Sequence, residues 1–260
     1  MSAQTNQNPI LSVRDISVAF GGIIALDNVT FDVQRGQICG LIGPNGAGKT
    51  TLFNCLSRLY TPSNGTITFD GHAILSMPAN RIATIGIGRT FQNLALFNSM
   101  TVSKNALTGA HSLMHSGFIS DALRLPFVAR EEHKFAEIAD ELISFLDLDE
   151  VRDVPVSQLP FGTRKRVEMA RALATNPKLL LLDEPAAGLN HEEVDNLMTI
   201  IQSLKERYKM SVLLVEHHMN LVMSVSDKVV ALDFGRKIAD GTPETVRTDP
   251  DVIRAYLGAE

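Results

Sequence analysis

The stretch Gly43-Pro-Asn-Gly-Ala-Gly-Lys-Thr50 decides the fold of this chain. It matches the pattern G-x-x-x-x-G-K-[ST] at every fixed position, and the preceding run 37–42 (QICGLI) is typical of a buried strand. A helix is predicted from about Gly48 to Arg58. Strand, glycine-rich turn and helix in this order form a P-loop, whose inward-pointing backbone N–H groups and helix N-terminus attract anions. We therefore expect phosphate to bind at Gly43, Pro44, Asn45, Gly46, Ala47, Gly48, Lys49, Thr50 and Thr51.

Two acidic residues follow a second apolar run. Residues 179–182 are all leucine, and Asp183 and Glu184 come directly after them. Such a pair can simply mark the end of a strand, but a carboxylate at the C-terminal end of a buried strand points into the ligand crevice of an open α/β sheet. We expect Thr50 and Asp183 to bind Mg²⁺, Lys49 to reach the β- and γ-phosphates of ATP, and Glu184 to polarise the attacking water. ATP and Mg²⁺ are thus the predicted cofactors.

Strands and helices alternate along most of the chain, which indicates an α/β fold with a mostly parallel sheet covered on both faces. Strands are predicted at 11–20, 29–33, 66–70, 179–182 and 212–216, and more are expected in the C-terminal part. Helices are predicted at 161–175 and 192–207, with a short one opened by Asp249-Pro250-Asp251. Residues 101–150 are mainly helical, with 111–127 assigned as a loop with a short helix. One helical face there carries Phe135, Ile138, Leu142, Phe145 and Leu146.

The composition narrows the class of protein. The 260 residues are 45% hydrophobic, as in an ordinary globular protein, and the net charge of -5 argues against nucleic acid as a partner. Cys39 and Cys55 lie in apolar surroundings, which favours buried thiols in a reducing cytosol. No apolar run reaches the roughly 18 residues that span a bilayer. Because residues 1–8 also resemble neither a signal peptide nor an anchor, we expect any contact with a membrane to run through a partner protein.

Three more segments resemble the nucleotide-binding domain of ABC transporters. Leu159-Pro-Phe-Gly162-Thr-Arg lies at the place of that family's L-S-G-G-Q signature, Gln92 follows Arg89-Thr-Phe like the Q-loop glutamine, and His217 follows a strand like the switch histidine. The resemblance covers essentially the whole chain. It implies one domain, 1–260, with an N-terminal antiparallel β subdomain and an inserted helical subdomain at about 93–175 that includes the signature. In the family, two such domains enclose two ATP molecules, each between one P-loop and the other subunit's signature.

The resemblance also implies roles for single residues. Gln92 is expected to bind the metal or the attacking water and to link the site to the transmembrane partner, and His217 to donate a hydrogen bond to the γ-phosphate during catalysis. Phe20 is expected to stack on adenine, although it also fits the core of a strand. On the opposing ATP we expect contacts from Leu159, Pro160, Phe161 and Gly162.

Finer sequence patterns are similar to the ATPases of branched-chain amino acid importers. They are residues 89–102 (RTFQNLALFNSMTV), 183–190 (DEPAAGLN), 216–219 (EHHM) and 253–258 (IRAYLG). Such complexes pair two different ATPases with two permeases and a periplasmic solute-binding protein, so the resemblance implies a peripheral subunit at the cytoplasmic face of the inner membrane that is soluble when isolated. Urea, amides or another small solute remain open, because no residue here is expected to contact the solute. Two further classes of protein also fit the P-loop, a soluble ABC ATPase acting on DNA or ribosomes and a P-loop kinase.

Two departures from the family pattern concern the signature and the loop after Glu184. Asn190 replaces an aspartate common in relatives, and Pro160 and Thr163 replace the usual serine and glutamine. Proline offers neither a hydroxyl nor an N–H, so we expect this chain alone to be a poor ATPase whose productive partner is a second, different ATPase. The competing interpretation is harmless variation. The cations at 164–166 crowd the helix N-terminus, where they oppose the helix dipole, which suggests that a polyanion binds opposite them.

Overall fold

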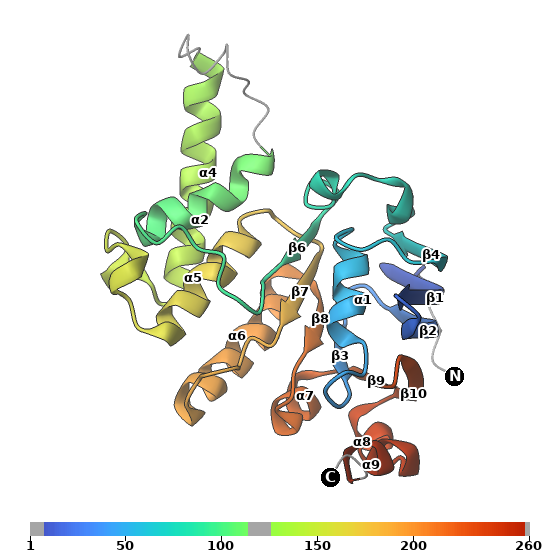
Figure 1. Cartoon of the computed structure of the whole chain (residues 1–260). Coiled ribbons are helices and arrows are strands. Elements are labelled where there is room, and N and C mark those ends of the chain that lie inside the picture. The colour runs from blue at the N-terminus through green and yellow to red at the C-terminus, as the bar shows by residue number, and fades with distance from the viewer. Residues whose placement is uncertain (1–7, 114–125, 258–260) are drawn as a thin grey trace, which may run out of the picture.

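The computed structural model describes residues 8–113 and 126–257, and it places an antiparallel sheet beside a larger core sheet (Figure 1). The antiparallel sheet has the order β2-β1-β4-β5 and consists of β1 (Leu11–Phe20), β2 (Ile23–Val33), β4 (Asn64–Phe69) and β5 (His72–Ala73). The sequence predicted the second strand from residue 29 only. It begins at Ile23 because a two-residue turn pairs Ile23 with Phe20 and extends the hairpin.

The core sheet has the order β10-β9-β3-β8-β7-β6. Its strands are β3 (Ile38–Ile42), β6 (Ile87–Arg89), β7 (Leu179–Asp183), β8 (Ser211–Val215), β9 (Lys228–Asp233) and β10 (Arg236–Gly241). The pairs from β9 to β6 are parallel and the β9–β10 pair is antiparallel, which confirms the predicted mostly parallel α/β architecture. The sequence missed β6, because three residues are too few to show a period.

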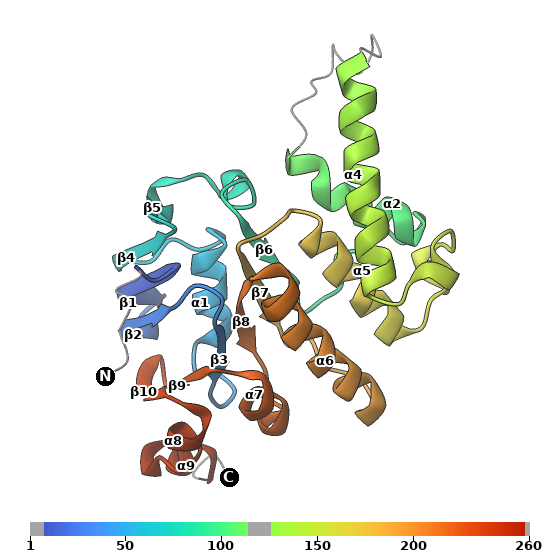
Figure 2. The same cartoon turned by 180° about the vertical axis from the view of Figure 1, so that it is seen from behind.

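Helices cover the core sheet and form a separate layer at one end of the molecule (Figures 1 and 2). Beside the sheet lie α1 (Lys49–Leu56), α6 (His191–Tyr208), α7 (Met219–Val225), α8 (Pro243–Arg247) and α9 (Pro250–Leu257). The end layer consists of α2 (Val102–Ala110), α4 (Pro126–Phe145) and α5 (Phe161–Leu173). Short 3-10 turns occupy Ile74–Ser76, Ala79–Arg81, His111–Leu113, Asp149–Val151 and Val156–Gln158. Of the predicted loop at 111–127, residues 114–125 lie outside the described residues.

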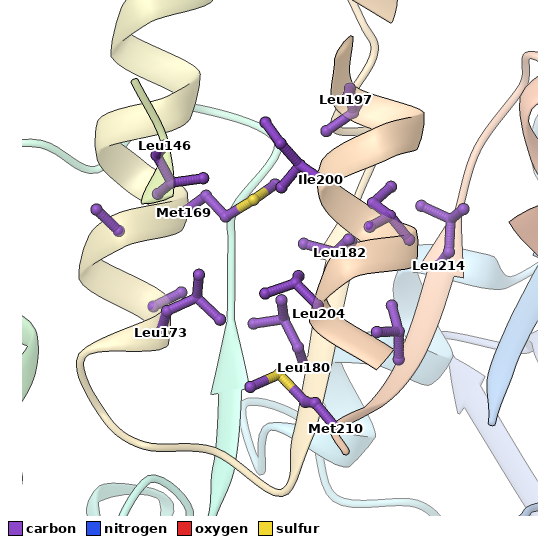
Figure 3. Packing of buried hydrophobic residues seen from close by; sticks show 14 of the residues in the cluster. Leu146, Met169, Leu173, Leu180, Leu182, Leu197, Ile200, Leu204, Met210 and Leu214 are labelled. Carbon is purple, nitrogen blue, oxygen red and sulfur yellow. The ribbon is translucent and has the colours of Figure 1, made fainter. Parts of the chain in front are cut away.

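Alternation along the buried strands divides the apolar core in two. Leu180 and Leu182 of β7 pack with α5 and α6, as Figure 3 shows, whereas Leu179 and Leu181 belong to the cluster shared with α1 and the antiparallel sheet. The predicted helical face also packs into the first cluster, since Leu142 is buried there. In the part of the chain that the structure describes, no helix is long and apolar enough to cross a bilayer.

Candidate functional site

The P-loop connects β3 to α1 and already contains its lysine. Lys49 is 5% exposed, and its Nζ donates hydrogen bonds to the carbonyl oxygens of Gly43 at 2.7 Å and Pro44 at 2.9 Å. Burial lowers the pKa of this ammonium, because desolvation penalises its charge. No acidic side chain occupies the first turn of α1, so the partial positive charge of the helix N-terminus is not neutralised locally. The loop therefore brings a lysine ammonium and a helix N-terminus together, an arrangement that suits phosphate.

Asp183 ends β7, and its two carboxylate oxygens differ in their surroundings. The side chain is 2% exposed and its Oδ2 accepts from Nη2 of Arg89 at 2.8 Å, whereas Oδ1 is buried and has no hydrogen-bond partner among the described residues. Burial raises the pKa of Asp183 although Arg89 opposes that shift. Together with Thr50 and Gln92, Asp183 lines a cavity of about 250 Å³. The three residues predicted to bind metal therefore share one cavity, and their oxygen atoms are the ligand type that Mg²⁺ prefers.

Arg89 was not singled out as a site residue by the sequence, yet it organises this cavity. Besides Asp183, its guanidinium bonds Asn54 Oδ1 at 3.0 Å and Ser57 Oγ at 2.9 Å, and it lies 4.9 Å from the ring centroid of Phe91. It thus joins β6, α1 and β7 through one buried cation. The residues that accept its hydrogen bonds are 32 to 94 positions away in sequence, so no local pattern reveals them.

The carboxylate of Glu184 contacts two of the predicted site residues. Gln92 donates from Nε2 to Oε2 at 2.8 Å, and Nε2 of His217 lies 2.7 Å from Oε1. These side chains follow β6, β7 and β8, three parallel neighbours whose C-terminal ends meet at one edge. The structure therefore brings together Gln92, Glu184 and His217, which are widely separated in sequence.

A second buried acid, Glu216, fixes the backbone around this triad. It is 1% exposed, and its carboxylate accepts from the backbone N–H groups of Ala186 at 2.5 Å and His217 at 3.0 Å. The sequence reasoning gave it no role of its own. A charged residue at the end of an apolar strand, as in 211–216, is the signal that points to it.

The signature segment lies at the start of α5. Leu159 is buried, Pro160 is the N-cap without a side-chain cap, and Phe161 is half exposed. No hydrogen bond among the described residues joins this segment to the P-loop. Gly162 is in close contact with α6, since a Cβ there would lie 2.2 Å from Oε1 of Glu193.

The cations of this helix already have hydrogen-bond partners within the chain. Arg164 donates to the carbonyl oxygens of Leu159 and Ser157, and Arg166 to that of Leu146. Lys165 donates to the backbone oxygen of Glu184 at 2.8 Å. Carbonyl oxygens satisfy hydrogen-bond donors but do not neutralise charge, so a polyanion opposite these cations stays a prediction.

Phe20 and Asn190 also have defined surroundings. Phe20 is 47% exposed and meets Tyr60 edge to face with ring centroids 5.2 Å apart, so it is not core of a strand. The sequence reasoning missed Tyr60. Asn190 caps α6 in a reciprocal capping box with Glu193, which is a local reason for an asparagine at this position.

Comparison with known proteins places this architecture in a family. Residues 26–187 match the ABC transporter family, and residues 236–260 match the branched-chain amino acid ATP-binding cassette transporter family. The chain is 43% identical to the high-affinity branched-chain amino acid transport ATP-binding protein BraF of Pseudomonas aeruginosa, over 96% of this chain and 98% of that protein. It is 42% identical, with the same coverage, to the corresponding protein LivG of Escherichia coli.

A solved structure agrees with these matches. An ATP-binding cassette of an ABC transporter in its ADP conformation is 30% identical, with a TM-score of 0.82 over 97% of this chain and 100% of that one. The P-loop fold and site define an ATP-binding ATPase. The chain belongs to the ABC transporter family, in the group of branched-chain amino acid transport ATP-binding proteins.

Proposed function

We propose that this chain is the ATP-hydrolysing subunit of a complex that imports branched-chain amino acids, and that it works as a peripheral subunit at the cytoplasmic face of the inner membrane. The observation that carries hydrolysis is the convergence of Gln92 and His217 on the carboxylate of Glu184, beside Asp183. The names of the similar proteins support the solute. The whole chain acts as one nucleotide-binding domain whose helical part, about 93–175, contains the signature.

The P-loop residues 43–51 bind the phosphates. Lys49 exchanges the carbonyl oxygens of Gly43 and Pro44 for the β- and γ-phosphate oxygens, which are stronger acceptors because they are charged. Phe20 supplies a half-exposed ring on which adenine stacks.

Thr50, Gln92 and Asp183 would hold Mg²⁺, because they line one cavity and Oδ1 of Asp183 has no hydrogen-bond partner in the part of the chain that the structure describes. Bound there, the ion would supply positive charge against the phosphate oxygens. Burial raises the pKa of Asp183, and Arg89, which donates to Oδ2, opposes that rise and so favours the ionised carboxylate.

Glu184 acts as the general base that accepts a proton from the attacking water. Gln92 and His217 each contact one oxygen of this carboxylate, whose remaining lone pairs can accept a hydrogen bond from water. His217 then donates to the γ-phosphate and Gln92 orients water or metal. Positioned general-base help of this kind is worth about 10²–10⁴-fold in rate.

The permease docks in an apolar groove between the core and the helical layer. The groove holds about 690 Å³ and includes Leu59, Ile82, Phe91, Phe97 and Arg171. Phe97 is half exposed, and an exposed apolar groove of this kind is typical of an interaction site. Crosslinkers at Asn98 and Ser99 should capture the permease. Val102, the first residue of α2, is fully buried and is therefore not a suitable position for a crosslinker.

The dimer partner is a second ATPase subunit, either another copy or, as the signature suggests, a different chain. In the dimer the segment Leu159–Gly162 of each subunit faces the ATP of the other. The periplasmic solute-binding protein is then an indirect partner through the permease, and nucleic acid has no role.

The solute and the reaction are tested on the complex co-purified with its permeases. Phosphate release should rise when the solute-binding protein carries leucine, isoleucine or valine, and ADP and phosphate should be the sole products. Stimulation by urea instead would replace the proposed solute. A phosphorylated small molecule would indicate a kinase, and activity indifferent to any permease would favour a soluble ABC ATPase.

A further inference from the structure

The C-terminal helix α9 contacts the first residue of the P-loop. The backbone N–H of Gly43 donates a hydrogen bond to the hydroxyl oxygen of Tyr256 at 2.8 Å, across 213 positions of sequence. The ring is partly buried, and burial raises the pKa of the phenol, so the hydroxyl is neutral near pH 7. Neither the residue nor the contact has a role in the site described above.

Gly43 has room for no side chain and therefore depends on its backbone groups. Its φ is +151°, and a Cβ would lie 2.2 Å from the carbonyl oxygen of Leu232. The N–H bonds Tyr256, and the carbonyl oxygen accepts from Lys49 at 2.7 Å. One residue thus connects the C-terminal helix to the lysine that must change partners when phosphate binds.

Tyr256 is a main attachment of α9 to the loop. Of the apolar residues in this helix, Val252 is buried, whereas Ile253 is 43% and Leu257 74% exposed. A cleft of about 520 Å³ separates much of the loop from the helix, with Asn45 on one side and Arg254 on the other. The match to the branched-chain amino acid transporter group covers this helix, while the general ABC match ends at residue 187.

We propose that Tyr256 is a positioning residue for nucleotide binding: its hydroxyl holds the Gly43 peptide while Lys49 moves from loop carbonyls to phosphate oxygens. The inference rests on the proposed role of the P-loop. Because coupling between two sites is reciprocal, nucleotide binding also tightens the docking of α9.

The effect falls on affinity rather than on the chemical step. Tyr256→Phe keeps the ring and removes one hydrogen bond, which should weaken Mg-ADP and Mg-ATP alike by about three- to tenfold. The two nucleotides are affected equally because the loop grips phosphates that both contain. KM for ATP should rise by the same factor while kcat at saturating ATP stays at the wild-type value.

The experiment is a calorimetric titration of the full chain with Mg-ADP. Tyr208→Phe is the matched control, since the hydroxyl of Tyr208 in α6 also makes one hydrogen bond, to Glu141 of α4 at 3.3 Å. Hydrogen exchange of α9 amides, with and without Mg-ADP, gives a second readout: protection should increase in wild type and in Tyr208→Phe, and not in Tyr256→Phe.

Wild-type affinity of Tyr256→Phe for Mg-ADP would overturn the inference. If the melting temperature of the free protein fell at the same time, the hydrogen bond would have a structural role only. A wild-type chain that does not bind Mg-ADP would overturn the proposed nucleotide site itself and this inference with it.

Discussion

The P-loop and the signature segment each begin a helix, α1 and α5, and each is expected to hold phosphate, yet they are equipped differently. The P-loop carries a buried lysine and is tied to the rest of the chain, since Gly235 donates to the carbonyl oxygen of Ala47 at 3.1 Å. In the signature segment, Pro160 stands at the N-cap of α5 and has no hydroxyl and no N–H to offer.

This difference teaches which half of the site depends on a partner. The residues of this chain that are predicted to bind the metal and to hydrolyse ATP lie at one edge of the core sheet: Thr50, Gln92, Asp183, Glu184 and His217. The half that would close over the partner's ATP keeps only the backbone amides of α5 after Pro160. A homodimer would carry this weak half at both sites, and a mixed dimer at one.

Glu184→Gln should have the largest effect, and it tests the half of the ATP site that a single chain supplies. The amide keeps the size of the side chain but cannot accept a proton, so turnover should fall by about 10²–10⁴-fold while ATP binding persists. Phosphate release and ATP titration measure the two effects separately. Release at the wild-type rate would remove Glu184 from the role of base.

Arg89→Met should destabilise the fold by about 3–5 kcal/mol at pH 7, because it leaves the buried Asp183 carboxylate unpaired. The pKa of Asp183, already raised by burial, should rise further. The unfolded state releases this proton above pH about 4, whereas the folded state keeps it up to its own, higher pKa. Between these two pKa values the free energy of unfolding should therefore fall as pH rises. Denaturant unfolding from pH 4 to 7 checks this, and a deficit that is the same at every pH would contradict it.

Lys49→Ala should lose nucleotide affinity by about 1.5–3 kcal/mol, which is roughly 10- to 150-fold, through loss of a hydrogen bond to a charged group. Lys134→Ala, an exposed lysine of α4, is the control and should bind normally. Unchanged affinity in Lys49→Ala would mean that the backbone cradle is sufficient, and the contrast with the signature would weaken.

Pro160→Ser should restore the hydroxyl group that the signature segment lacks. If the missing hydroxyl matters, the homodimer gains up to about 1.5–3 kcal/mol at each site, and the isolated chain releases phosphate faster. The mixed dimer should gain less. An isolated wild-type chain that is already fully active and insensitive to Pro160→Ser would show that the proline is harmless variation.

Gly162→Ala should have the smallest effect, about 0.5–2 kcal/mol of stability. The new methyl would displace Glu193, whose carboxylate accepts from the N–H of Asn190 at 2.9 Å in the cap of α6. Thermal unfolding in a cycle with Glu193→Ala measures the coupling: in the Glu193→Ala background the glycine change should cost almost nothing. If Gly162→Ala lowered the stability equally with and without Glu193→Ala, the strain would not arise from the contact with Glu193.

Sequence predicted what is local and missed what is distant. The P-loop and the Asp183-Glu184 pair are contiguous, and their strands and helix are short-range patterns, so the fold class and phosphate site followed from residue order. Gln92 and His217 entered only through a family resemblance, because strand order in the sheet is what brings them to Glu184. Arg89 lies 94 residues from its carboxylate, and Tyr256 lies 213 residues from its glycine. No period or motif marks such pairs.

The most direct test compares phosphate release by the isolated chain with release by the same chain in complex with the permeases and the second ATPase proposed for it, each beside its Glu184→Gln form. We predict a rate at least about tenfold higher in the complex, since the missing half corresponds to a hydrogen bond to a charged group. Most of that rate should be lost with Glu184→Gln. An isolated chain that already reaches the rate of the complex, or a complex indifferent to Glu184→Gln, would contradict the account.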